Sequence, residues 1–279
     1  MTVKTLADID IPQIAEAINQ SFSDYIVPFQ LNAEQLQYKI IQEDVKLDLS
    51  VGVFDGEALV GLMLHGLRKN EDHLVAYNAA TGIIPTYRGK RLVSKMYDLL
   101  VPKLKELQVQ KMVLEVIEGN DPAIKAYEKM GYTISRKLVC FSGTVQVDET
   151  PKEISIKEAT TFQWNKWLSF WDIQPSWQNA VQSAENSKAI SKALEAYLDS
   201  ELVGYLIYNP NSKKVNQFAV SASHRQKGIA TALFSHLQQV LNSEIYVYNI
   251  DGASPACISF LTALGLKEKV NQFEMERAV

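Results

Sequence analysis

Hydrophobic residues follow two alternating spacings along the chain. Residues 11–22 have apolar side chains three or four positions apart, which predicts a helix with one buried face. Residues 50–54 and 58–67 are short apolar runs separated by an acidic turn, which predicts two adjacent strands. A third apolar run, 74–83, leads into a basic turn, and residues 92–104 return to helical spacing. Strands that alternate with helices in this way indicate a sheet covered by helices.

The same order of elements recurs in the second half of the chain. Its apolar runs predict strands at 193–198, 202–208, 215–220 and 244–248, with a helix from 229 between the last two. Three pairs of segments match between the halves in the same order: 55–61 with 199–204, 83–93 with 220–230, and 120–132 with 254–266. A repeat of this length indicates tandem domains and not a solenoid.

The sequence therefore predicts an α/β protein, in the α+β layered form, with two tandem domains. Each domain is expected to have a mixed central sheet flanked by helices. We place the boundary in the polar, proline-bearing segment 145–152. The predicted domains are then residues 1–147 and residues 148–279.

Composition narrows the class of protein. With 47% hydrophobic and 22% charged residues, the chain is typical of globular proteins, and a net charge of −4 argues against a nucleic-acid partner. There is no apolar run of membrane-spanning length and no signal-peptide pattern at the N-terminus, so we expect a cytoplasmic protein with no membrane partner. The two cysteines, Cys140 and Cys257, lie far apart without ligand spacing, and we expect no metal.

Each basic turn has the features of a phosphate-binding loop. An apolar run ends, an arginine and a lysine follow, and an amphipathic helix begins. The N–H groups of such a turn and of the helix N-terminus attract an anion such as a pyrophosphate. Two interpretations of Arg88 and Arg225 follow: they belong to an anion site, or they are solvated residues at a helix start.

These motifs resemble those of the GNAT superfamily of acyl-CoA-dependent N-acyltransferases, in a tandem two-domain form. The second turn, Arg225-Gln226-Lys227-Gly228-Ile229-Ala230, matches the family pattern Arg/Gln-x-x-Gly-x-Gly/Ala fully. The first turn has Arg91 and Val93 where the family has small residues. Residues 114–132 resemble the family's second signature, and the resemblance covers essentially the whole chain.

The resemblance implies that acetyl-CoA is the acyl donor and that a small-molecule or peptide amine is the acceptor. It places the pyrophosphate on the turns and the pantetheine arm beside the strands that precede them. The implied cofactor-binding residues are Ile83, Ile84, Pro85, Arg88, Gly89, Lys90, Arg91, Leu92, Val93, Asn120, Val220, Ser221, Arg225, Gln226, Lys227, Gly228, Ile229 and Ala230. Asn249 is the nearest counterpart of Asn120 in the second copy.

Tyr127 is the catalytic residue that the resemblance implies. A tyrosine at this place in the family protonates the departing coenzyme A thiolate, and the second copy has Phe260 there. The alternative is that Tyr127 is a packed aromatic on the apolar face of its helix. Glu115 is a possible base for the amine, but the sequence assigns none.

Three functions remain open. The first is an N-acyltransferase in which the amine attacks directly in a ternary complex and the first copy does the chemistry. The second makes the C-terminal copy the working domain, because its turn is intact. The third is a non-catalytic acyl-CoA sensor or interaction module, because neither copy has all the expected parts.

Overall fold

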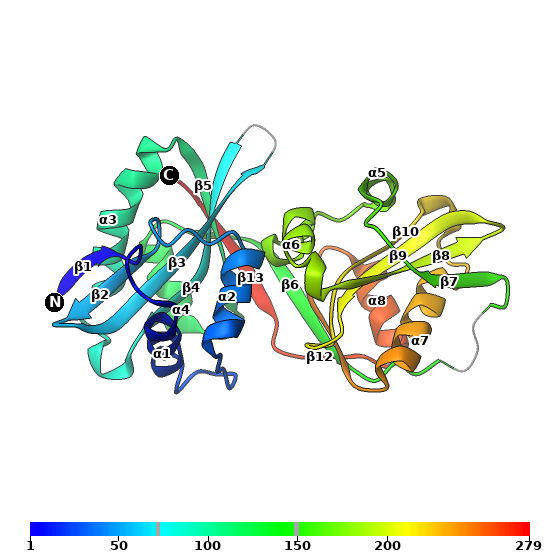
Figure 1. Cartoon of the computed structure of the whole chain (residues 1–279), viewed down its shortest axis with the longest axis horizontal. Helices are drawn as coiled ribbons and strands as arrows, with labels where there is room; N and C mark the ends of the chain where they lie inside the picture. The colour runs from blue at the N-terminus through cyan, green and yellow to red at the C-terminus, as the bar shows by residue number, and fades with distance from the viewer. Residues whose placement is uncertain (71–72, 148–150) are drawn as a thin grey trace. The chain divides into compact units, whose positions relative to one another are not determined.

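The computed structural model describes residues 1–70, 73–147 and 151–279 of the chain (Figure 1). They form two compact units, Met1–Ser135 together with Phe273–Val279, and Arg136–Gln272. Residues 148–150 of the predicted linker lie outside the described residues. No helix of the described chain is long and apolar enough to cross a membrane.

The first unit is a mixed sheet with helices on both faces. Its strand order is β1-β2-β3-β4-β5-β13-β6, and β4 and β5 are parallel neighbours. The elements in chain order are β1 (Thr2–Thr5), α1 (Ile11–Ser21), α2 (Ala33–Gln42), β2 (Val51–Asp55), β3 (Ala58–Asn70), β4 (His73–Ile83), the 3₁₀ turn η1 (Pro85–Tyr87), α3 (Leu92–Glu106), β5 (Val109–Ile117), α4 (Asp121–Lys129) and β6 (Thr133–Gly143).

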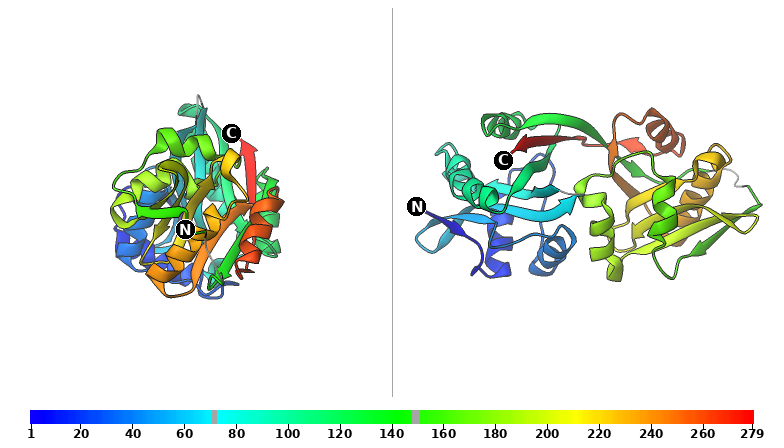
Figure 2. Two further views of the ribbon diagram at one scale, coloured as in Figure 1. Left: turned by 90° about the vertical axis from the view of Figure 1, so that its right-hand side faces the viewer. Right: turned by 90° about the horizontal axis from the view of Figure 1, so that it is seen from above.

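Side chains on the two faces of β3 belong to different cores. Leu62 and Leu64 pack in one cluster with residues of α1 and α2, and Val60 and Met63 pack in another with residues of α3. Figure 2 accordingly shows α1 and α2 (blue) on one side of these strands and α3 (teal) on the other. From Gly61 on, the alternation follows from the two-residue period of a strand. Val60 lies in a β-bulge between Leu59 and Gly61, which turns its side chain to the face of Met63.

The second unit repeats this plan. Its strand order is β6-β11-β10-β9-β8-β7, with β12 also paired to β6. Its elements are β7 (Ile154–Glu158), α5 (Trp164–Trp167), η2 (Leu168–Phe170), η3 (Trp177–Asn179), α6 (Val181–Asn186), η4 (Lys188–Ile190), β8 (Lys192–Leu198), β9 (Glu201–Asn209), β10 (Lys214–Val220), η5 (Ala222–His224), α7 (Ile229–Leu241), β11 (Ile245–Asp251), α8 (Pro255–Ala263) and β12 (Lys267–Glu268). The last strand of the chain, β13 (Gln272–Ala278), lies almost entirely in the first unit.

The α/β class and the tandem repeat are thus confirmed, but the chain path departs from a linear division. Strand β6, which follows the first copy, pairs with β11 in the second unit, where Phe141 lies opposite Val247. Strand β13 ends the chain and lies beside β5 in the first unit, where Met275 is fully buried. The compact units therefore do not end at 147/148, because each sequence copy supplies a late strand to the other copy's sheet.

Candidate functional site

The two basic turns have the same backbone conformation with the glycine at different places. In the first turn, Gly89 has φ 77° and Arg91 has φ 56°. In the second, Gln226 has φ 59° and Gly228 has φ 77°. In each turn, the first and the third residue after the arginine have a left-handed backbone. One of these two positions is a glycine in each turn: the first position in the first turn and the third position in the second. The first turn therefore has the left-handed positions of the second turn although its glycine lies at the other one of the two.

The helix after each basic turn begins without a side-chain cap. Asp10, Asn32 and Asn120 cap α1, α2 and α4 by accepting from backbone N–H groups of the first turn. Neither Arg91 before α3 nor Gly228 before α7 forms such a bond within the described chain. The first N–H groups of these two long helices are consequently available to an anion, which the positive end of the helix dipole also attracts.

Arg88 fixes the first turn by three contacts. Its Nε donates to the carbonyl oxygen of Ile83 (3.1 Å), and Nη2 donates to that of Ser21 (2.9 Å). Nη1 forms an ion pair with Asp24 at 2.7 Å, and this hydrogen bond lowers the pKa of the Asp24 carboxyl. The guanidinium therefore holds the turn to the end of α1 and is not simply solvated.

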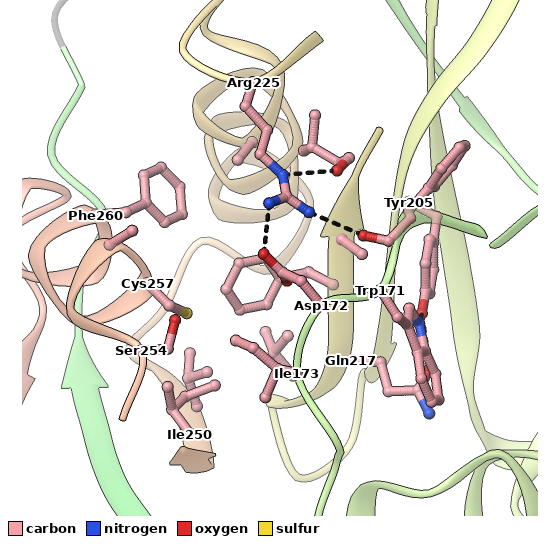
Figure 3. Close-up of a pocket in the computed structure, with 18 of the residues that line it drawn as sticks. Trp171, Asp172, Ile173, Tyr205, Gln217, Arg225, Ile250, Ser254, Cys257 and Phe260 are labelled. Atoms are coloured by element: carbon pink, nitrogen blue, oxygen red, sulfur yellow. Dashed lines mark hydrogen bonds and ion pairs between the residues drawn. The ribbon is translucent and has the colours of Figure 1, made fainter. Parts of the chain in front are cut away.

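Arg225 makes the corresponding contacts in the second unit. Its Nε donates to the carbonyl oxygen of Val220 (3.2 Å), Nη2 donates to that of Phe170 (3.0 Å), and Nη1 pairs with Asp172. Figure 3 shows this guanidinium between the start of α7 and the loop that carries Asp172. The sequence match between the turns thus extends to their side-chain partners.

A cavity of about 620 Å³ lies beside the second turn (Figure 3). The parallel strands β10 and β11 pair only at Lys214 with Tyr246 and at Val215 with Val247. Beyond these pairs the strands are no longer joined, and residues 216–220 and 247–251 line the cavity. The turn residues Arg225, Gln226 and Gly228 also line it. One continuous space therefore connects the uncapped start of α7 with the separated strands.

One wall of the cavity is apolar. Phe260 of α8 packs against the rings of Phe218 and Phe234, with centroids 6.0 and 5.6 Å apart. Cys257 lies one helical turn before Phe260, and burial, together with the negative charge of Asp172, raises the pKa of its thiol to about 12. The thiol is therefore protonated at neutral pH and is a poor nucleophile.

The opposite wall carries a hydrogen-bonded chain of polar side chains. Trp171 Nε1 donates to the Tyr205 hydroxyl (2.7 Å), which donates to Gln217 Oε1 (3.0 Å). Gln217 Nε2 donates to the carbonyl oxygen of Asn179, whose own Nδ2 donates to the carbonyl oxygen of Tyr248 (2.8 Å). Burial raises the pKa of Tyr205, so its hydroxyl keeps its proton. These residues come from η2–η3, β9, β10 and β11.

Sequence reasoning missed this polar wall. Trp171, Asn179, Tyr205 and Gln217 belong to no shared motif and are brought together only by the fold. The one signal in the sequence is that Gln217 interrupts an apolar strand, as Asn78 does in the first copy.

Tyr127 is half-buried in the first unit, on α4. Its ring contacts Tyr132 edge-on at 5.9 Å, and it packs against the α3 core. Burial raises the pKa of Tyr127, and a hydrogen bond with Thr81 of β4 opposes the shift. The phenol is therefore protonated at neutral pH and is directed toward the strand before the first turn. Both interpretations of Tyr127, acid and packed aromatic, are compatible with this placement.

The two predicted asparagines lie at different kinds of position. Asn120 caps α4 by accepting from Ala123 N–H (3.4 Å), and it also interacts with Tyr25, whose pKa is raised by burial and lowered by this hydrogen bond. Asn249 is buried in a bulge of β11 with φ 63°, where it donates to Ser176 Oγ (3.2 Å). Asn249 lines the cavity but does not cap a helix.

The remaining sequence predictions concern Glu115 and metal binding. Glu115 accepts a hydrogen bond from Tyr77 at 3.2 Å on neighbouring strands of the first unit. In the described parts of the chain, no group of three or more His, Cys, Asp or Glu side chains is arranged to hold a metal ion.

The chain is similar to known proteins in both sequence and structure. The model of the acetyltransferase (GNAT) family matches residues 12–132 and again residues 156–266. The mycothiol acetyltransferase of Corynebacterium efficiens is 32% identical over 89 residues, which are 32% of this chain and 29% of that protein. That of Corynebacterium glutamicum is 30% identical over 89 residues, 32% of this chain and 30% of that one. The matches thus span less than a third of these relatives.

Solved structures show the same fold over the whole chain. A GCN5-related N-acetyltransferase from Sphaerobacter thermophilus superposes with a TM-score of 0.74 at 16% identity, covering 99% of this chain and 95% of that one. A tandem GNAT protein from the clavulanic acid biosynthesis pathway gives a TM-score of 0.75 at 12% identity, covering 99% and 98%.

Proposed function

We propose an activity for this chain, which belongs to the acetyltransferase (GNAT) family: it transfers the acetyl group of acetyl-CoA to a primary amine, and the C-terminal unit does so. The observation that carries the proposal is the cavity between β10 and β11, which is continuous with the uncapped start of α7. Donor and acceptor can therefore meet inside one unit. The curated relatives are described as acetyltransferases, which supports this type of reaction.

The residues of the second turn fit the phosphate end of acetyl-CoA. The N–H groups of Ile229 and Ala230 lie at the uncapped end of α7, and Gln226 and Gly228 hold the left-handed turn that exposes them. Lys227 is exposed at the same turn and adds a positive charge. When bound, acetyl-CoA supplies the activated acetyl group.

The separated part of β10 fits the thioester end. Residues 216–220 are not paired with β11 in the described chain. Their backbone N–H groups on the edge that faces β11 can therefore donate to the acetyl carbonyl. Such donors stabilise the oxyanion that forms when an amine attacks, by a few kcal/mol each. The protonated thiol of Cys257 makes a covalent acetyl-enzyme unfavourable, which supports direct attack of the amine in a ternary complex.

A second candidate places the chemistry in the N-terminal unit. It is supported by the protonated phenol of Tyr127, which is hydrogen-bonded to Thr81 on the strand before the first turn. In this alternative Tyr127 protonates the departing thiolate, as the family resemblance implies. Tyr127→Phe then lowers turnover much more than acetyl-CoA affinity, and unchanged turnover contradicts it.

Charge reversal at the matching lysines of the two turns tests the proposal. Lys90 and Lys227 are both exposed, so neither substitution disturbs a core. We expect Lys227→Glu to weaken acetyl-CoA binding about tenfold in titration calorimetry, equal to about 1.4 kcal/mol, and Lys90→Glu to leave the affinity unchanged. The reverse result assigns binding to the first unit. Binding without release of coenzyme A in the presence of any amine from a broad panel would identify a non-catalytic sensor.

A further inference from the structure

We propose that Arg136 is a positioning residue of the C-terminal cavity, because its guanidinium fixes the loop 171–176 across the opening between β10 and β11. This inference deepens the proposed acetyl transfer and rests on it for the identity of the ligands. Arg136 is not among the described residues that line the cavity, so it acts on the reaction through the loop. Its role is to hold one wall of the space in which donor and acceptor meet.

The loop 171–176 forms a wall of the cavity but has no helix or strand of its own. Four of its residues line the cavity: Trp171, Asp172, Ile173 and Pro175. Because β10 and β11 are parallel, their last residues, Val220 and Asp251, lie at the same edge of the sheet. Asp172 is bound to Arg225 in the turn after β10. The start of the loop is thus fixed on the β10 side of the opening.

Arg136 fixes the other end of the loop to the end of β11. Its Nη1 donates to the carbonyl oxygen of Gln174 (2.6 Å), and its Nη2 donates to that of Pro175 (3.5 Å). Nη1 also pairs at 3.0 Å with Asp251, the last residue of β11. The side chains of Arg136 and Asp251 are only 17% and 19% exposed, so water replaces these contacts poorly. One planar guanidinium therefore joins two loop carbonyls to the end of the strand, an arrangement that a lysine ammonium does not reproduce.

Arg136 reaches this site because β6 belongs to the sheet of the second unit. Leu138, two residues after Arg136, lies opposite Asp251 of β11. Strand pairing therefore brings the guanidinium beside the carboxylate. The C-terminal cavity thus depends on a residue that precedes the predicted domain boundary at 147/148.

The stretch that Arg136 controls lies between two independent attachments. Asp172 is bound to the basic turn, and Ser176 Oγ accepts a hydrogen bond from Asn249 Nδ2 at 3.2 Å. Loss of the Arg136 contacts therefore releases residues 173–175 and leaves both flanking attachments in place.

Cys257 reports on the position of this stretch. Its side chain lines the cavity, as do Ile173 of the loop and Ile250 of β11 (Figure 3). Cys140, the only other cysteine of the chain, is 2% exposed on β6. Release of the loop should expose Cys257 alone, whereas a general loosening of the unit exposes both thiols.

Alkylation of the two cysteines in the full chain tests the inference. The rate of alkylation by iodoacetamide at a fixed, alkaline pH is followed by mass spectrometry of the peptides that contain Cys140 and Cys257. Arg136→Lys keeps the positive charge but not the planar group. We expect it to speed alkylation of Cys257 about fivefold and that of Cys140 by less than about twofold. The affinity for acetyl-CoA in calorimetry should stay within about threefold of the wild type, because the basic turn is unchanged.

Arg68→Lys is the matched control. The Arg68 side chain, in the first unit, is 9% exposed, and its guanidinium joins Asp44 to the carbonyl oxygen of Gln42. This variant loses a similar buried contact and should leave the alkylation rate of Cys257 unchanged. Asp251→Asn keeps an oxygen for the guanidinium but not the charge, and we expect it to speed alkylation of Cys257 about twofold. If Arg136→Lys does not fold, Asp251→Asn carries the test.

The possible outcomes separate this inference from the proposed function. An unchanged rate at Cys257 in Arg136→Lys and Asp251→Asn overturns the inference. Equal acceleration at Cys257 and Cys140, or acceleration at Cys257 by Arg68→Lys, also overturns it. Acetyl-CoA should slow alkylation of Cys257 in the wild-type protein. Absence of that protection contradicts the proposed function of the C-terminal unit but not the attachment of the loop.

Discussion

Arg225 repeats the three contacts that Arg88 makes: the carbonyl five residues before it, the carbonyl of the last residue of an earlier helical segment, and an aspartate just beyond that carbonyl. In both units the guanidinium joins the basic turn to the segment that precedes the first core strands. The turn and this loop are therefore positioned together. In the second unit the loop also carries Trp171, so Arg225 indirectly positions one wall of the cavity.

We predict that the hydrogen bonds of Arg225 to backbone carbonyls contribute more to the free energy of unfolding than its ion pair with Asp172 does. The Arg225 and Asp172 side chains are 39% and 59% exposed, and exposed pairs contribute about 0–1 kcal/mol. Arg225→Ala also removes two hydrogen bonds of about 1 kcal/mol each and is expected to cost about 2 kcal/mol in urea unfolding, against under about 1 for Asp172→Asn. Equal losses for the two variants would contradict this account.

The two turn glycines are predicted to differ in their tolerance of alanine. Both have φ 77°, where a Cβ costs about 1–2 kcal/mol. At Gly89 a Cβ meets nothing within 4 Å, but at Gly228 it would lie 2.7 Å from Pro151 Cγ. Gly228→Ala should therefore lower the unfolding midpoint clearly more than Gly89→Ala. If the two lower it equally, Pro151 does not pack on the turn in solution.

His65 is predicted to make the first unit sensitive to acid. Its ring is fully buried on β3, neither ring nitrogen has a partner among the described residues, and burial lowers its pKa to about 3. The unfolded chain therefore protonates this imidazole at a higher pH than the folded chain does. The free energy of unfolding falls as the pH drops from about 6.5 toward 3, by up to about 1.4 kcal/mol per pH unit.

The matched variant for this prediction is His65→Leu. It removes the titrating ring, so the variant should lose about 2 kcal/mol less than the wild type between pH 7.5 and pH 5 in chemical denaturation. The carboxylates that also titrate are the same in both proteins and cancel in the difference. Parallel stability profiles would show that His65 is hydrated or partnered.

Cys257 is predicted not to carry the acetyl group. Because the pKa of its thiol is about 12, the rate of alkylation by iodoacetamide should still rise with pH well above pH 9. An ordinary thiol is already ionised there, and its rate no longer rises. Cys257→Ala should keep turnover within about threefold of the wild type. Mass spectrometry of the protein with acetyl-CoA alone checks the chemistry, and an acetylated peptide containing residue 257 would contradict direct transfer.

Local patterns were enough to identify the repeated α/β fold. The spacing of apolar residues fixes which segments are strands and helices, and the matching turns show that the plan occurs twice. The same patterns could not show the exchange of β6 and β13. A late strand buries the same side chains whichever copy's sheet it completes, so its sequence does not reveal which one it joins.

The candidate site also has one part that the sequence determines and one part that only the tertiary structure determines. The sequence by itself determined the two turns, since Arg88 and Arg225, with the left-handed positions after them, are properties of a few consecutive residues. Only the tertiary structure decided what stands beside each turn. The separation of β10 from β11, and the meeting of Asn179, Tyr205 and Asn216 around the space between them, depend on contacts between distant segments, which no local pattern records.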